Sequence, residues 1–408
     1  MQAHAVSQAR SLPVSFAIRP RRQPFLEALE HIDYGRMTLI TPEGNGLEFS
    51  GTEKGPTAYL RLYDWEVLDD LVARGEMGFV EAYIDVRWNT TDLPALLTFG
   101  LMNSQSLERF FHGNPLQALL SRVRYLWHNN SLHGSKRNIM AHYDMGNDFY
   151  ALWLDKNMTY SGALFEGDET RSLEDAQTAK YRRILNKIAA QPGDHILDIG
   201  CGWGGFAEFA ARHGMKVTGI TISEKQASYA RERLYCTGLH RLATIELTDY
   251  REITGIYDHI VSIGMFEHVG EQYWPAYFDT IKKCLRPDGR AVVQTITLDD
   301  YLFESLHHYN GFIEQIIFPG GMLPSKSRFH NAASKAGLTC QEMFSFGQDY
   351  ARTTCEWLSR FEAHKWDITA LGYDESFLRL WRFYLASCIA SFASHRTDVM
   401  QAELVHDA

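Results

Sequence analysis

The spacing of hydrophobic positions changes along the chain at about residue 170. From about residue 172, short apolar runs alternate with longer segments in which apolar residues recur every three to four positions. The runs are HILDIG (195–200), KVTGITI (216–222), ATIELTD (243–249), YDHIVSIG (257–264) and RAVVQTIT (290–297). Strands at this spacing, joined by helices, predict an α/β fold with a parallel sheet and right-handed crossovers. Ser172, with Asp175 three residues later, is typical of the start of the first of these helices.

The remaining segments follow other patterns. Residues 1–110 mix strand-like pieces, helical pieces and turn glycines, which predicts a small α+β domain. Residues 111–140 are basic and carry leucines at helical spacing, which predicts a linker helix. Residues 141–408 form the predicted catalytic domain, and the chain beyond residue 300 is aromatic and helical, as in ESFLRLWRFYLASCIASF (375–392).

Net charge is −10, which argues against a nucleic-acid partner bound by a diffuse basic surface. The charge is uneven, however, because no Asp or Glu occurs between Arg109 and Tyr143. Two interpretations stay open: a patch that meets an anionic membrane, or a solvated helix face.

The cysteine and hydropathy patterns indicate the cellular compartment of the protein and whether it binds a metal. The six cysteines form no CxxC pair and no cluster at zinc-ligand spacing, so we expect no metal and a reducing compartment. No run of 18 apolar residues occurs, and the N-terminal residues lack the apolar region of a signal peptide. These patterns favour a cytoplasmic protein.

The segment LDIGCGWGGFAEFA places Gly200, Gly202, Gly204 and Gly205 between a strand and a helix. Such a turn allows a ligand to approach the backbone closely, but nicotinamide enzymes use one too. Asp198 lies before the first glycine, as in enzymes that use S-adenosylmethionine (SAM). A nicotinamide site would instead want an acid at the end of the second strand, where this chain reads GITISEKQ. The pattern therefore favours SAM.

Over nearly its full length, the chain resembles the cyclopropane-fatty-acyl-phospholipid synthase family. The resemblance rests on AHYDMGNDFY, MTYSGALF, LDIGCGWGG, GITISEKQ, SIGMFEHVG, IFPGGMLPS and FGQDYARTT, which occur in the family's order. It implies a Rossmann-like class I methyltransferase sheet with a helical lipid-binding cap. The N-terminal domain would be the lipid-associated one of the longer bacterial members.

The resemblance also implies an activity. Family members transfer the SAM methyl group to a double bond in an acyl chain of a membrane phospholipid, which leaves a carbocation on the chain. Aromatic faces stabilise such a cation, and this chain has 23 Phe, 20 Tyr and 9 Trp. It further implies peripheral association with the inner face of the cell membrane, and a homodimer.

Residues that would contact SAM by this resemblance lie on five short segments. They are Tyr160, Ser161, Asp198, Gly200, Gly202, Thr221, Ile222, Gln226, Asp249, Tyr250 and Ile263.

A proton must leave the methylated chain, and family members hold a bicarbonate ion as the base. Of the side chains in that cradle, Glu267 and Tyr350 are in place, and Ile296 supplies the amide position. The family's Cys is Gly162 here, and its His is Gln294. Three outcomes stay open: weak bicarbonate binding with a cyclopropane product, Glu267 as the base itself, or loss of another proton to give a methyl-branched or methylene product. We favour a ring-free product.

Two other classes compete with this interpretation. One is a SAM methyltransferase of a small molecule or quinone, against which the N-terminal domain and IFPGGMLPS argue. The other is a non-catalytic protein that binds lipid or SAM and has lost its base.

Overall fold

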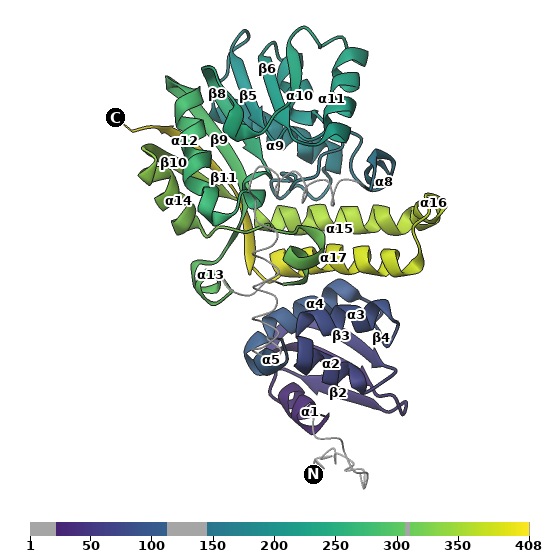
Figure 1. Cartoon of the computed structure of the whole chain (residues 1–408). Helices are drawn as coiled ribbons and strands as arrows, with labels where there is room; N and C mark the ends of the chain where they lie inside the picture. Colours follow the sequence, from purple (N-terminus) through teal and green to yellow (C-terminus); the bar gives the residue numbers. More distant parts are fainter. Residues whose placement is uncertain (1–21, 112–144, 307–310, 408) are drawn as a thin grey trace, which may run out of the picture.

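The computed structural model describes residues 22–111, 145–306 and 311–407. A small N-terminal domain and a larger catalytic domain lie on opposite sides of two long helices (Figure 1). The predicted linker helix at 111–140 lies outside the described residues, except for Phe111.

The N-terminal domain is a four-stranded sheet covered by helices. Its strands follow the order β2-β1-β3-β4, and β1 runs parallel to β3 and antiparallel to β2. The elements are α1 (Arg22–Glu30), β1 (Tyr34–Ile40), β2 (Gly46–Ser50), β3 (Glu53–Leu62), α2 (Glu66–Arg74), α3 (Glu76–Ile84), β4 (Trp88–Asn89), α4 (Leu93–Met102) and α5 (Ser104–Phe111). Strand β1 alternates exposed and buried residues, as expected of a sheet with one face on a core.

The catalytic domain is built on a seven-stranded sheet in the order β10-β11-β9-β8-β5-β6-β7. Strands β7, β6, β5, β8 and β9 are parallel, and β11 is antiparallel to both β9 and β10. The bounds are β5 (His195–Ile199), β6 (Lys216–Thr221), β7 (Ala243–Leu247), β8 (Tyr257–Ile263), β9 (Leu285–Leu298), β10 (Leu338–Ser345) and β11 (Thr397–His406). The order reverses between β5 and β8, and ligands of open α/β sheets bind at such a point.

Helices of the catalytic domain begin where the sequence supplies caps. The side chain of Ser172 accepts a hydrogen bond from the Asp175 amide at the start of α9, as predicted, and Ser223 caps α11 in the same way. The helices around the sheet are α8 (Asn147–Ala151), α9 (Leu173–Lys187), α10 (Gly205–Arg212), α11 (Glu224–Cys236), α12 (Trp274–Cys284), α13 (Asp300–Leu306) and α14 (Lys326–Lys335).

Helices α15 (Gly347–Ala363) and α17 (Glu375–Ala393), joined through α16 (Lys365–Ala370), form the cap between the sheet and the N-terminal domain (Figure 1). Helix α17 packs against α3 and α4. Its buried Arg379 fixes this contact, because Nε donates to the Tyr83 carbonyl oxygen at 2.6 Å. The N-terminal domain therefore docks directly on the cap.

The predicted α/β fold class, with its helical cap and its α+β N-terminal domain, is confirmed. Two details were wrong. The chain beyond residue 300 is not wholly helical, because it also supplies β10 and β11. The last predicted strand begins earlier than the run at 290–297, because β9 starts at Leu285, and its pairing with β8 shifts register between Tyr257 and His259. Within the described residues, no helix combines the length and the hydropathy needed to cross a membrane.

Candidate functional site

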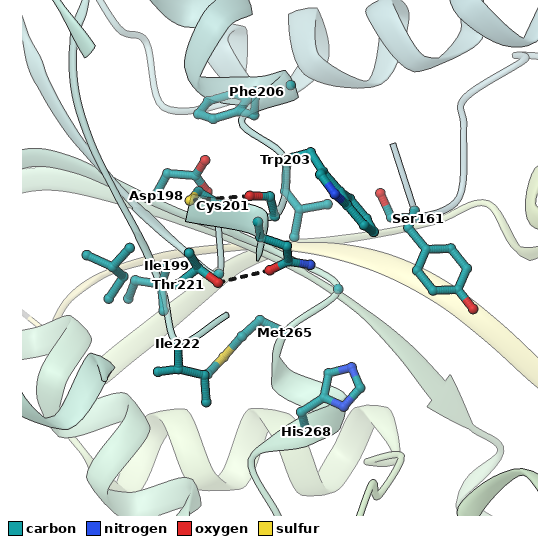
Figure 2. A pocket seen from close by; sticks show the side chains of 18 of the residues that line it. Ser161, Asp198, Ile199, Cys201, Trp203, Phe206, Thr221, Ile222, Met265 and His268 are labelled. Carbon is teal, nitrogen blue, oxygen red and sulfur yellow. Dashed lines mark hydrogen bonds between the residues drawn. The ribbon is translucent and has the colours of Figure 1, made fainter. Parts of the chain in front are cut away.

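A cavity of about 130 Å³ opens where β5, β6, β7 and β8 end (Figure 2). The turn after β5 lines it, and Gly200, Gly202 and Gly204 there have φ values of 80°, 53° and 79°. At Gly200 a side chain is also excluded by contact, since its Cβ would lie 2.8 Å from Met265 Cβ and Cγ. These glycines keep the backbone open to a ligand.

Asp198 lies in β5 beside this turn and is fully buried. Its Oδ2 has no hydrogen-bond partner among the described residues, and burial raises the pKa of the carboxyl to about 7. An unsatisfied buried acceptor facing a cavity is suited to a ligand that brings a donor or a positive charge.

The far side of the same cavity is made by the ends of β6 and β7. Thr221 Oγ1 donates to Gln226 Oε1 at 2.9 Å, and Ile222 lines the same cavity (Figure 2). Asp249, expected to contact SAM, also lines the cavity and forms an ion pair with Arg251 at 2.7 Å.

The structure thus gathers the cofactor residues expected from the sequence around one cavity. Tyr160, Ser161, Asp198, Gly200, Gly202, Thr221, Ile222, Gln226, Asp249, Tyr250 and Ile263 all line it. Among the described residues, no three His, Cys, Asp or Glu side chains gather in a metal-binding arrangement.

Sequence reasoning missed Lys180 in α9. Its Nζ donates to Ser161 Oγ at 2.6 Å and is completely buried, which lowers the pKa of the amine to about 7. The signal was present, because Lys180 lies four residues from both Ala176 and Ile184 on the buried face of the helix. A lysine on such a face is rare without a partner.

A second, larger cavity of about 720 Å³ meets the first at the end of β8. Tyr160, Gly264 and His268 line both cavities. The second cavity is mainly apolar near this point, with Phe318, Trp357, Tyr384 and Phe392 in its lining. A methyl group held in the first cavity can therefore reach the second cavity by passing Tyr160, Gly264 and His268.

Glu267 faces the second cavity from the short 3-10 helix Phe266–His268. Oε1 accepts a hydrogen bond from the Ile296 amide at 2.7 Å, whereas Oε2 is unpartnered in the described parts of the chain. Burial raises the pKa of this carboxyl to about 7, and it lowers that of the neighbouring His268 to about 4. Glu267 is consequently poised to gain or lose a proton near neutral pH, while His268 is neutral.

The other positions of the predicted bicarbonate cradle are arranged differently. The ring of Tyr350 occupies the space beside Gly162, since a Cβ there would lie 2.8 Å from Cγ and Cδ1 of Tyr350. Gln294 is buried and does not line either cavity. Its Oε1 accepts from Gln401 Nε2 at 3.0 Å across the β9–β11 pairing.

Bicarbonate does not fit this arrangement. The Ile296 amide is taken by Glu267, Gly162 brings no polar group, and Gln294 is turned toward Gln401. Of the cradle positions, Glu267, Ile296 and Tyr350 line the larger cavity.

Comparison with known proteins identifies the family of this chain. The sequence model of the mycolic acid cyclopropane synthetase family matches residues 130–402. A tuberculostearic acid methyltransferase of Mycobacterium tuberculosis is 35% identical over 82% of this chain and 79% of its own length. The cyclopropane-fatty-acyl-phospholipid synthase of Escherichia coli is 33% identical over 84% and 87%.

Solved structures give the same family. A cyclopropane synthase of Mycobacterium tuberculosis superposes with a TM-score of 0.62 at 33% identity, over 66% of this chain and 97% of its own. A mycolic acid cyclopropane synthase in complex with S-adenosylhomocysteine and CTAB gives the same values. With the SAM-type glycine turn, the buried Asp198 and the adjoining apolar cavity, these matches show that the chain is a SAM-dependent methyltransferase and belongs to the mycolic acid cyclopropane synthetase family.

Proposed function

We propose that the protein methylates a double-bond carbon of an unsaturated acyl chain of a membrane phospholipid and releases a ring-free, methyl-branched or methylene product. The observation that carries this proposal is Glu267, a residue that lines the larger cavity and whose buried Oε2 has no hydrogen-bond partner among the described residues, at a position where bicarbonate does not fit. The relatives' names include both methyltransferases and cyclopropane synthases, so the choice of product rests on this chain's own residues.

SAM supplies the methyl group as a sulfonium when it is bound. Ser161, held by Lys180, and the carboxylate of Asp198 would bind and orient the methionine part of the cofactor. Tyr160 would line the path of the methyl group, and its hydroxyl is fixed by Tyr384 at an O–O distance of 2.7 Å.

Methyl transfer would break the methyl–sulfur bond of the sulfonium, with its electron pair left on sulfur. The π electrons of the alkene would form the new C–C bond to one carbon, and the positive charge would remain on the other carbon. The aromatic side chains next to the transfer point provide π faces for this charge. Tyr160 and Trp357 have ring centroids 5.3 Å apart, and Phe318 lies 6.3 Å from Tyr160. These rings also exclude water, which would otherwise trap the cation.

Proton loss completes the reaction. Glu267 in its carboxylate form accepts the proton on Oε2, while the Ile296 amide holds Oε1 in place. The C–H electron pair that is released forms a C=C bond in the ring-free product, so charge and atoms balance.

Incubation of the purified protein with SAM and vesicles of an unsaturated phospholipid tests the proposal. Mass spectrometry should find lipid that has gained one CH₂. Mild hydrogenation should then add hydrogen to this product, because a ring-free product keeps a double bond and a cyclopropane largely resists. A product that resists hydrogenation would assign the ring-closing reaction instead, and SAM binding without turnover on any unsaturated phospholipid would refute the enzymatic proposal.

A further inference from the structure

The larger cavity does not end in the catalytic domain. Its catalytic lobe, defined by Tyr160, Glu267, Phe318, Trp357 and Tyr384, is continuous with a second lobe inside the N-terminal domain. This N-terminal lobe is lined by apolar residues from α1, β1, β3, α2 and α4: Phe25, Met37, Leu60, Leu68, Leu97 and Phe99. The core of the N-terminal domain is therefore hollow and opens toward the methyl-transfer site.

Charged and polar groups meet where the two lobes join. This charged junction consists of Glu76 and Ser104 from the N-terminal domain and Glu314 and Arg396 from the catalytic domain, and all four line the cavity. Arg396 Nη1 donates to Ser104 Oγ at 3.1 Å, and the amide of Phe312 donates to Glu76 Oε2 at 3.1 Å. The residues are thus one cluster at the contact between the domains.

The two carboxylates lie close together at Gly311. A Cβ on this glycine would be 3.0 Å from Oε2 of both Glu76 and Glu314, so a side chain there would obstruct the junction. Burial raises the pKa of Glu76, and burial together with Glu76 raises that of Glu314 to about 7. Burial also lowers the pKa of Arg396. These groups carry a desolvation cost that a polar ligand would relieve.

We propose that one diacyl glycerophospholipid occupies both lobes, with its unsaturated chain in the catalytic lobe, its second acyl chain in the N-terminal lobe, and its glycerophosphate end at the charged junction. This inference rests on the proposed function and assigns the N-terminal lobe to the second acyl chain of the lipid.

The junction distinguishes this arrangement from a single chain that crosses both lobes. A single chain would place methylene groups against two carboxyl groups and a guanidinium, which would stay desolvated without new partners. The polar end of a diacyl lipid brings a phosphate for Arg396 and ester oxygens for Ser104 or a protonated Glu314. The branch point of such a lipid also lies between two hydrocarbon chains, as the junction lies between two apolar lobes.

Photocrosslinking of the unaltered, full-length protein is the first test. The probe is a diacyl phosphatidylethanolamine with a cis-monounsaturated chain and a diazirine on its saturated chain. We expect adducts in the peptides of α1, β3 and α4, which line the N-terminal lobe. Adducts confined to α15 and α17, or no adduct beyond that of a soluble diazirine control, would overturn the proposal.

A pair of variants gives the second test. Leu97→Trp narrows the N-terminal lobe, whereas Leu47→Trp adds the same ring to a partly buried leucine of β2 that does not line the cavity. In detergent, Leu97→Trp should lower kcat/KM at least tenfold on the diacyl lipid. It should leave kcat/KM on a lysophospholipid with the same unsaturated chain within twofold of that of the Leu47→Trp control. Equal losses on both lipids, or no loss, would refute the two-lobe arrangement.

The two proposals fail in different ways. If neither lipid is methylated by the unaltered protein, the proposed function fails. If both are methylated but the probe and the Leu97→Trp variant show no involvement of the N-terminal lobe, the two-lobe inference alone fails.

Discussion

Replacement of Glu267 by Gln tests the assignment of the base most directly. Gln keeps an oxygen that accepts the 2.7 Å hydrogen bond from the Ile296 amide, but it cannot take up a proton. General-base catalysis typically contributes ~10²–10⁴-fold, so kcat should fall by a factor in that range. Glu267 does not line the cofactor cavity, and the Kd for SAM should therefore stay within about twofold.

The pH dependence gives the same residue a second signature. The carboxyl titrates with a pKa of about 7 instead of its usual 4.5, because burial disfavours the charged form. Since the base must be ionised, kcat/KM on a fixed lipid should fall tenfold per pH unit below about pH 7 and level off above it. This fall in kcat/KM below pH 7, the acidic limb of the pH–rate profile, should be missing in the Glu267→Gln variant.

As pH rises, the free energy of unfolding of the cofactor-free protein should fall, whereas the activity of the enzyme should rise. A carboxyl whose pKa is raised by folding stabilises the folded state only while it is protonated, and this contribution is lost as pH rises from about 4.5 through 7. A pKa shift of ~2.5 units corresponds to a loss of about 3 kcal/mol from the free energy of unfolding at pH 8. The Gln side chain does not ionise, so the variant avoids this loss. Glu267→Gln should thus unfold at a higher temperature than the unaltered protein at pH 8, and the difference should vanish near pH 4.

Glu232→Gln, on the exposed surface of α11, is the matched control and should change neither the pH–rate profile nor the Tm. Full turnover of Glu267→Gln, or an unchanged acidic limb, would refute the assignment of Glu267 as the base.

Three further predictions follow from the site. Asp198→Asn should weaken SAM binding in a titration yet raise the Tm of the apoprotein at pH 8. The reason is that a pKa of about 7 instead of 3.8 makes ionisation of this buried carboxyl cost up to about 4 kcal/mol; an equal Tm would contradict the reasoning. Lys180→Met removes the donor to Ser161 and should raise the Kd for SAM by about 10–100-fold, given ~1.5–3 kcal/mol for a charged hydrogen bond; an unchanged Kd would exclude Lys180 from cofactor binding. Gly162→Cys combined with Gln294→His should reduce turnover without creating a ring product, because the new Cβ would lie 2.8 Å from the Tyr350 ring; a hydrogenation-resistant product would show that the cradle can be restored.

Local patterns in the sequence determined the sheet and its cofactor turn. The strands from β5 to β9 and the helices between them follow from periodicity, and the cap at Ser172 follows from a hydrogen bond across three residues. The glycines at 200, 202 and 204 adopt the positive φ values that favour glycine, so this turn is encoded where it stands.

Strand β11 shows what local patterns did not reveal. It lies between β9 and β10 and is buried along most of its length, yet it carries Gln401 and Glu403 in its interior. These polar residues are satisfied by distant partners, since Gln401 bonds to Gln294 and Arg183, and Glu403 pairs with Arg290. The periodicity of the sequence cannot predict such hydrogen bonds and ion pairs, because their partners lie more than 100 residues apart.

The chemistry of the site was decided in the same way. The motifs named Glu267, Gly162, Gln294 and Tyr350 as one cradle, but only tertiary packing turned Gln294 away and set the Tyr350 ring beside Gly162. Docking of α3 and α4 on α17 likewise joined a cavity in one domain to that of the other. Sequence therefore specified the local turns and the type of cofactor, whereas contacts between distant segments decided which groups face the lipid, because they depend on how those segments pack.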